Sequence, residues 1–434
     1  MEAQEAGIVR KNEGFVTASP RRPSRTQLAA VAAGNALEFY DFLVFGIFAV
    51  HIGATFFPAK DATGSLLFAL ATFGAGFLTR PLGGVLIGRL GDRIGRKPGM
   101  LLSFGLMGLS IVGLALTPSY ASIGVVAPIL VLFFRLPQGF AIGGEVGPTI
   151  AFLMEAAPAE KRGLYIALQT GSQQVGSACA GIVGVVLASL LTPQSLSAWG
   201  WRIAMLLGAS VVPLALAIRR RLPETLERRE GTKLPRPSLA QIGAALLTLM
   251  TLASVTITTY VLITIGTFAT HTLKLSPAVG FGAVVIGGLI GAFSNLVGGK
   301  LSDRLGRKPV MIGAYGLLCL IGVPCFMAMS QLRTPAALYI AVSLMASLLG
   351  LGLPPIVAQV SESMPVQMRS GAIGIIYAVA ITVFGGTTSF VVTWLTEVTQ
   401  SPLAPAVYMC AALALGLVGM FAMRETAPIK TGGL

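Results

Sequence analysis

One charged motif occurs twice in this chain of 434 residues. The run Asp-Arg-x-Gly-Arg-Lys-Pro occupies residues 92–98 and returns 211 positions later, at residues 303–309. A second motif repeats in the same order: a Glu is followed by Pro three positions later and by Arg seven positions later, at residues 155–162 and 362–369. Two different motifs duplicated in parallel order predict a chain made of two copies of one structural unit.

The composition predicts that both units lie in a membrane. Hydrophobic residues make up 54% of the chain, charged residues only 11%, and the mean hydropathy is +0.80. A soluble chain of this length needs far more charge to cover its surface. We therefore expect an all-α membrane protein with two six-helix bundles. Spans of roughly 20 residues predict twelve transmembrane helices, near residues 27–50, 64–87, 99–118, 123–151, 164–191, 201–218, 241–268, 277–298, 309–330, 335–358, 370–396 and 402–423.

The positive charges orient these spans. All but six of the 31 Lys and Arg residues fall in the N-terminal segment, the even-numbered connections or the C-terminus, and the exceptions are Lys60, Arg80, Arg135, Arg202, Lys274 and Arg333. By the positive-inside rule, both termini then lie in the cytoplasm. The net charge of +14 is thus a topology signal for a protein in a lipid bilayer and does not indicate nucleic-acid binding.

The same pattern predicts five segments. Residues 1–26 form a polar N-terminal segment without the features of a signal peptide. Residues 27–218 form the first six-helix bundle, and residues 241–423 form the second. A basic linker, residues 219–240, joins them on the cytoplasmic side, and residues 424–434 form a cytoplasmic tail.

Nothing in the sequence indicates enzymatic chemistry. The four cysteines are scattered through apolar runs without metal-ligand spacing, so no metal or cofactor is expected. The two histidines, His51 and His271, lie near predicted outer helix ends, and no nucleophile–base pair or phosphate-binding loop is present.

The repeated motifs place opposite charges at the cytoplasmic ends of the helices. Asp92 can face a neighbouring helix N-terminus, where the helix dipole favours negative charge. The loop arginines can pair with the glutamates of the second motif. Glu145 is deep enough to meet the loop at Arg93 or Arg96. We predict a gating role for Asp92, Arg93, Arg96, Glu145, Glu155, Arg162, Asp303, Arg304, Arg307, Glu362 and Arg369. Alternatively, these loops only fix the topology.

These motifs, with their Glu and Arg partners, resemble the major facilitator superfamily over essentially the whole chain. The resemblance implies two six-helix bundles around a central cavity. It also implies that the charged clusters close the cytoplasmic side while the cavity is open to the outside.

Ionisable residues inside the predicted spans are candidates for function, because a charge in hydrocarbon costs several kcal/mol. Asn35, Glu38 and Asp41 follow one another at three-residue intervals and are predicted to share one broad face of the first helix. Arg80 lies in the second helix and Arg135 in the fourth.

At a rise of 1.5 Å per residue, Glu38 and Asp41 lie level with Arg135. Proton carriers of sugars in the same superfamily have an acid on helix 1 paired with an arginine on helix 4, and Asp41 and Arg135 match these positions. We therefore predict that Asp41, Glu38 and Arg135 couple a proton to transport. Alternatively, Glu38 is a static partner of Arg80 or Arg135.

Two arginines in a dry cavity suit a carboxylate substrate. Helix 5 adds Gln169, Ser172 and Gln173 on one face, and the second bundle offers only neutral groups, among them Tyr260 and Tyr377. The candidate substrate-binding residues are Arg80, Arg135, Asn35, Gln169, Ser172, Gln173 and Tyr377. An anionic metabolite fits this set better than a cationic drug.

Finer motifs resemble the metabolite:proton symporter branch of the superfamily. They are Gly34-Asn35-x-Leu37-Glu38-x-x-Asp41-Phe42, Arg80-Pro81-Leu82-Gly83 and Arg135-Leu136-x-Gln138-Gly139-Phe140. Ser172-Gln173-Gln174, Leu273-Lys274-Leu275-Ser276 and Phe384-Gly385-Gly386 are similar to carriers of citrate and tricarballylate. This resemblance implies a symporter of protons and a tricarboxylate in a bacterial inner membrane, and we expect it to be monomeric. The alternatives are a symporter of a dicarboxylate such as 2-oxoglutarate or of shikimate, a drug/proton antiporter, and a nutrient sensor that does not transport.

Overall fold

The apolar stretches of the sequence form helices in a computed structural model of the protein. The structure describes residues 25–94, 96–144, 146–220, 239–363 and 376–432. No strand occurs in these ranges. The elements of the first half are α1 (Arg25–Ile47), α2 (Ala49–Phe56), α3 (Ala62–Leu78), α4 (Arg80–Ile94), α5 (Arg96–Leu116), α6 (Tyr120–Ile123), α7 (Val126–Gly143), α8 (Val146–Ala156), η1 (Ala159–Lys161), α9 (Arg162–Leu190), α10 (Pro193–Ser195), η2 (Leu196–Gly200) and α11 (Trp201–Arg220).

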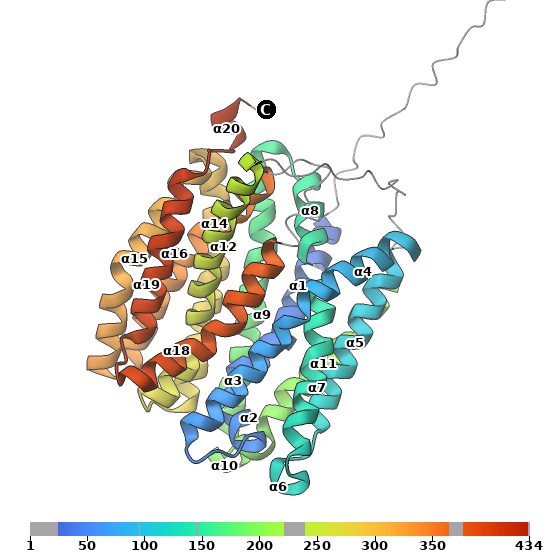
Figure 1. The fold of residues 1–434 in the computed structure, drawn as a ribbon, viewed down its shortest axis with the longest axis vertical. Coiled ribbons are helices and arrows are strands. Elements are labelled where there is room, and N and C mark those ends of the chain that lie inside the picture. Colours follow the sequence, from blue (N-terminus) through green and yellow to red (C-terminus); the bar gives the residue numbers. More distant parts are fainter. Residues whose placement is uncertain (1–24, 95, 145, 221–238, 364–375, 433–434) are drawn as a thin grey trace, which may run out of the picture.

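The second half repeats long helices at similar intervals. Its elements are α12 (Leu239–Ile263), α13 (Ile265–Thr267), η3 (Phe268–Thr272), α14 (Pro277–Leu305), α15 (Arg307–Leu332), α16 (Pro335–Glu362), η4 (Ile381–Gly385), α18 (Gly386–Thr399), α19 (Ala404–Ala422) and α20 (Pro428–Thr431). Figure 1 shows the two halves side by side, from blue to light green and from yellow to red.

The all-α prediction is confirmed, and each of the twelve predicted spans overlaps a helix. Within the described ranges, nine helices are long and apolar enough to cross a membrane, or ten if a bent pair counts as one span. That pair is the first predicted span, in which Val31–Ile47 and Ala49–Phe56 meet at 58°. The second span is interrupted at Thr79, just before Pro81, whose ring removes a backbone N–H donor. Predicted segments 1–26 and 219–240 lie mostly outside the described residues.

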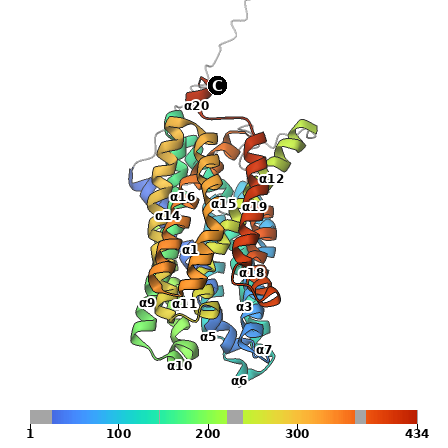
Figure 2. The ribbon, with the colours of Figure 1, turned by 90° about the vertical axis from the view of Figure 1, so that its left-hand side faces the viewer.

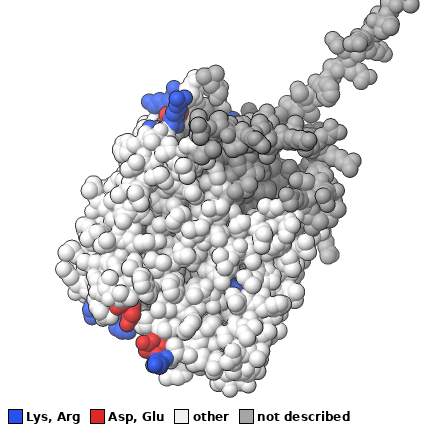
Figure 3. Space-filling view, viewed as in Figure 1, with Lys and Arg blue, Asp and Glu red and all other residues white. Residues whose placement is uncertain are grey.

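The surface of the molecule fits a bilayer. On the face seen in Figure 3, Lys, Arg, Asp and Glu gather towards the two ends, and a broad band between them is almost free of charge. Large apolar side chains such as Leu116, Leu190 and Leu320 are more than two-thirds exposed. Exposed apolar area on this scale is stable only against lipid or another apolar partner.

The two halves meet along α9 and α14, which run beside each other for most of their length (Figure 2). Small residues allow this approach: a methyl group added at Gly299 would lie 2.5 Å from the Gly163 carbonyl oxygen, and one added at Gly288 would lie 2.8 Å from the Ala178 Cβ. A second contact joins α3 to η4, where the Thr382 hydroxyl donates to the Phe77 carbonyl at 2.9 Å.

Contacts between the halves occur at both ends of the bundle. We call the end that carries residues 92–98 and 303–309 the loop end, and the other the far end. At the far end, the Thr63 hydroxyl lies 3.3 Å from His271 Nε2, and the His51 ring stacks on Phe281 with centroids 6.3 Å apart. At the loop end, α9 is bonded to Asp303 of α14. Among the described residues, the two halves are thus in contact at both ends.

The first half depends on very close helix crossings at glycine. A Cβ at Gly139 of α7 would lie 1.5 Å from the Gly76 carbonyl oxygen of α3. We expect Gly139→Ala to lower the midpoint of thermal unfolding in detergent, because forced overpacking costs about 1–3 kcal/mol. Gly105→Ala on α5 is the matched control, since nothing lies within 4 Å of the added methyl group. Equal midpoints for the two variants would contradict this packing.

Candidate functional site

Arg80 of α4 lies between two aromatic rings at the centre of the bundle. Its guanidinium carbon is 4.4 Å from the centre of the Phe42 ring and 4.3 Å from that of Phe77. The side chain is 3% exposed, and its Nε and Nη2 atoms have no hydrogen-bond partner within the described part of the chain. A planar cation held between rings is oriented, and its free N–H groups stay available.

Arg135 of α7 lies in the same aromatic cluster. Its guanidinium carbon is 4.5 to 5.1 Å from the ring centres of Phe42, Phe45 and Phe73. One N–H group donates to the Gln138 amide oxygen, and Nε has no partner among the described residues. The two guanidinium groups share the Phe42 ring and are close enough to repel each other.

Several buried donors around these arginines lack a protein acceptor. Besides the arginine nitrogens, the Nε2 amide atoms of Gln169 and Gln173 on α9 are buried without a partner in the described ranges. A buried N–H group without a partner costs about 1–3 kcal/mol. A set of such donors beside two cations is suited to an anionic ligand that offers several oxygen acceptors.

The second half contributes phenol groups to this cluster. Tyr260 of α12 interacts electrostatically with Arg80, and its ring packs edge-on against Phe77 with centroids 5.5 Å apart. Tyr377 also interacts electrostatically with Arg80, and its role in substrate binding stays a prediction. Tyr260 was indicated by the sequence only as one neutral group among several. Its position beside Arg80 depends on how the halves dock.

Asn35, Gln169 and Ser172 are brought together as one small polar group. The Asn35 amide donates to the Gln169 carbonyl oxygen at 2.9 Å and to the Ser172 hydroxyl at 2.8 Å. All three side chains are at least nine-tenths buried. These bonds fasten α1 to α9 beside the free Gln169 and Gln173 amides.

Asp41 is buried, but it does not form the predicted ion pair with Arg135. No ion pair joins these two residues in the described structure, and Asp41 Oδ1 has no hydrogen-bond partner there. Six residues turn a helix by 600°, so Asp41 lies about 120° around α1 from Asn35. The broad shared face predicted for them is therefore wrong: Asn35 faces α9, whereas Asp41 packs against Gly208 of α11.

Glu38 is 5% exposed and interacts electrostatically with Arg80. This position agrees with both interpretations of its sequence, as a coupling residue or as a static partner of the arginine. Its role stays a prediction.

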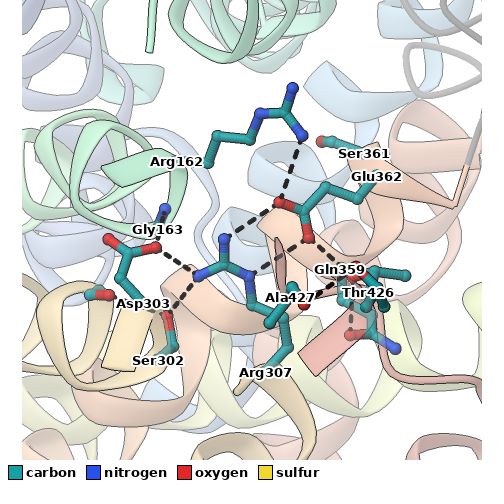
Figure 4. Close-up of polar contacts among 12 residues, drawn as sticks. Arg162, Gly163, Ser302, Asp303, Arg307, Gln359, Ser361, Glu362, Thr426 and Ala427 are labelled. Atoms are coloured by element: carbon teal, nitrogen blue, oxygen red, sulfur yellow. Dashed lines mark hydrogen bonds and ion pairs between the residues drawn. The ribbon is translucent and has the colours of Figure 1, made fainter. Parts of the chain in front are cut away.

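A second charged cluster, at the loop end, is built around Arg307 (Figure 4). Arg307 is fully buried and makes a two-point ion pair with Glu362, with Nη2 3.0 Å from Oε1 and Nε 3.3 Å from Oε2. It also contacts Asp303 at 2.6 Å. The predicted pairing of a loop arginine with the Glu of the second motif is thus present in the second half.

The same cluster bridges the two halves. The Asp303 carboxylate accepts from the backbone N–H groups of Gly163 and Leu164 at 2.8 and 3.0 Å, at the start of α9. A contact of this kind, between a loop aspartate and a helix N-terminus, was predicted for Asp92, whose side chain lies outside the described residues; its counterpart Asp303 makes it across the halves. Arg162 of the first half also lies 3.9 Å from Glu362.

The C-terminal tail joins this cluster, which the sequence did not reveal. The Thr426 hydroxyl donates to Glu362 Oε2 at 2.7 Å. Burial opposes ionisation of Glu425, but four backbone N–H donors outweigh it and lower the pKa of this carboxyl; they belong to Arg307, Lys308, Thr426 and Ala427. The contact therefore stabilises the fold above the ordinary pKa of Glu and is lost as the pH falls through the lowered value.

Several predicted gating residues cannot be placed. The side chains of Asp92, Arg93, Arg96, Glu145, Glu155 and Arg369 lie outside the described part of the structure. Arg304 is described and exposed.

Removing the Glu362 charge should favour opening at the loop end. In Glu362→Gln, Arg307 loses its two-point partner, and breaking a buried pair costs about 3–5 kcal/mol. Spin labels at Lys161→Cys and Lys300→Cys, one exposed position on each half, should show a longer distance in this variant. Glu160→Gln, an exposed change at the same end, is the control. Unchanged distances in Glu362→Gln would exclude this role.

Known proteins share this architecture. The Major Facilitator Superfamily profile matches residues 31–385. The D-xylose-proton symporter in its crystal structure superposes with a TM-score of 0.74 at 16% identity, covering 92% of this chain and 98% of that one. At this identity the likeness concerns the fold alone.

Three curated relatives are more similar in sequence. The citrate-proton symporter of Klebsiella pneumoniae is 35% identical over 403 residues, 89% of each chain. The alpha-ketoglutarate permease of Escherichia coli K12 is 33% identical over 390 residues, 87% of this chain and 88% of the permease. The proline/betaine transporter of the same strain is 32% identical over 429 residues, 94% of this chain and 85% of the transporter.

Proposed function

Because the chain belongs to the major facilitator superfamily, a family of membrane transporters and not of enzymes, we propose that it is a proton-coupled symporter that imports citrate or a related tricarboxylate by alternating access. It acts as a monomer in a bacterial inner membrane, with both termini in the cytoplasm. The bundles 27–218 and 241–423 rock about the substrate site, and the linker 219–240 joins them.

One observation carries the substrate class: Arg80 and Arg135 lie in one aromatic cluster with N–H groups that no acceptor in the described ranges uses. A polycarboxylate supplies the missing acceptors and the opposite charge. The relative named as a citrate-proton symporter supports this choice.

A dicarboxylate such as 2-oxoglutarate is the second candidate. It also places carboxylates on both arginines, and the alpha-ketoglutarate permease is similarly related to this chain. Proline and betaine fit less well. Their single carboxylate satisfies fewer donors, and a quaternary ammonium needs free aromatic faces, whereas Phe42 and Phe77 are occupied by Arg80.

The loop-end cluster supports alternating access. Asp303 and Glu362 join the halves there, and they must release α9 before the site opens to the cytoplasm. We propose that Asp303, Arg307, Glu362 and Arg162 form this gate and that the first-motif residues Asp92, Arg93 and Arg96, with Glu145, Glu155, Arg304 and Arg369, complete it.

Uptake into proteoliposomes tests the proposal. The purified protein is reconstituted and a proton gradient is imposed, with labelled citrate, tricarballylate, 2-oxoglutarate, shikimate, proline and betaine as separate substrates. We expect uphill accumulation of a tricarboxylate that stops when an uncoupler collapses the gradient. Accumulation of proline or betaine alone, or uptake indifferent to the uncoupler, would refute it.

A further inference from the structure

The Asp41 carboxyl lies against α11, on a different side of α1 from the polar contacts of Asn35. Its side chain is 7% exposed, and Oδ1 is buried with no hydrogen-bond partner in the described structure. A methyl group added at Gly208 would lie 1.8 Å from this oxygen. The carboxyl therefore fits only because residue 208 has no side chain.

Neighbouring contacts hold α1 and α11 in this position. The Tyr40 hydroxyl donates to the Ala204 carbonyl oxygen at 2.8 Å, one turn before Gly208. The Gln138 amide, which also binds Arg135, reaches the backbone oxygen of Asp41 at 3.4 Å and not its carboxyl. Gln138 thus joins the Arg135 guanidinium to the α1 backbone at Asp41.

The titratable groups around Asp41 are few. Tyr40 on α1 interacts with it electrostatically, and Cys179 on α9 interacts with Tyr40. Glu38 lies one turn earlier on α1 and interacts with Arg80. On α2, which also packs on α1, His51 is hydrogen-bonded to Ser197. Within the described residues, no cation pairs with the Asp41 carboxyl.

We propose that Asp41 and Gly208 form a proton-binding site separate from the arginine cluster, so that a proton and the substrate carboxylates bind side by side and do not compete. Gly208 is the positioning residue of this site. The inference rests on the proposed symport and specifies how it is coupled. A buried, unpaired carboxylate is costly, whereas the neutral acid is not, so this site holds a proton while α1 and α11 stay packed.

The alternative is an ion pair between Asp41 and an arginine that protonation releases. The two arrangements differ in one measurable respect. If Asp41 competed for an arginine, removing its charge would strengthen substrate binding. If the sites are separate, carboxylate affinity stays nearly the same whether residue 41 is ionised or neutral.

The experiment uses the full-length protein in detergent and four forms of it: wild type, Asp41→Asn, Gly208→Ala and the control Gly105→Ala, whose added methyl group meets nothing within 4 Å. Citrate, tricarballylate and 2-oxoglutarate are titrated by calorimetry across a pH series. Infrared pH-difference spectra follow the carbonyl stretch of the protonated carboxyl without any substrate.

In Asp41→Asn we expect carboxylate affinity to stay within about threefold of wild type above the infrared midpoint of Asp41, where the wild-type carboxyl is ionised and would compete for an arginine; threefold is less than 1 kcal/mol by the tenfold-per-1.4 kcal/mol relation. The infrared band assigned to Asp41 should be missing. In Gly208→Ala the displaced carboxyl should titrate with its midpoint moved by about one pH unit or more. Gly105→Ala should match wild type in both readouts.

Tenfold tighter carboxylate binding by Asp41→Asn would overturn the proposal, because it would show that Asp41 competes for the arginines. An infrared midpoint in Gly208→Ala equal to that of wild type would overturn the role of Gly208. The Asp41→Asn result does not depend on whether Gly208→Ala folds. If the wild type binds no carboxylate, the proposed function fails, and the substrate-free infrared titration still decides whether Asp41 is a proton site.

Discussion

Arg80→Lys is expected to weaken carboxylate binding by about ten- to a hundredfold, the equivalent of one charged hydrogen-bond pair worth 1.5–3 kcal/mol. The guanidinium is held flat between Phe42 and Phe77, and its Nε and Nη2 atoms have no hydrogen-bond partner among the residues that the structure describes. An ammonium keeps the charge but loses both the stacked plane and the fork that binds a carboxylate at two points. Calorimetric titration with citrate, or with the best substrate of the uptake panel, measures the change.

Arg333→Lys is the matched control, because Arg333 is an exposed residue at the end of α15, far from the aromatic cluster. It should bind substrate like the wild type. If Arg80→Lys also keeps its affinity, Arg80 is not part of the site, and the unpartnered N–H groups have another explanation.

The loop-end cluster could be predicted because its signal is local and repeated. Asp303, Arg307 and Glu362 belong to motifs whose spacing places them at helix ends on one side of the bundle, and opposite charges at helix ends find each other. The structure confirms these contacts for the second half. Glu425 and Thr426 lie in a short polar tail without a repeated pattern, so only the folded chain shows that they bind α15 and Glu362.

The central site was harder to predict. The position of a residue in the sequence gives its depth along the helix, but it does not give the direction in which the side chain points. Counting residues along a helix places Asp41 level with Arg135. It does not determine which neighbouring helix each side chain faces, and for Asp41 this depends on how α1 packs against α11 at Gly208. The aromatic neighbours of the arginines were missed for the same reason. Phe73 and Phe77 look like ordinary membrane-span residues until α3 packs beside α4 and α7.

Asp41→Asn is expected to abolish proton-driven accumulation while exchange of labelled for unlabelled substrate continues. Asparagine has nearly the shape of the neutral acid, so it should preserve packing against Gly208, and it cannot release a proton. Substrate then crosses in either direction without a coupled ion, and the gradient can no longer drive it uphill. Proteoliposomes measure both processes: uptake with a proton gradient, and exchange without one.

Asp61→Asn is the matched control, because Asp61 is exposed at the start of α3 and an amide oxygen can still accept from the Gly64 N–H. Undiminished uphill uptake by Asp41→Asn would remove Asp41 from the coupling step, and loss of exchange together with accumulation would mean that Asp41 is needed for movement of the bundles.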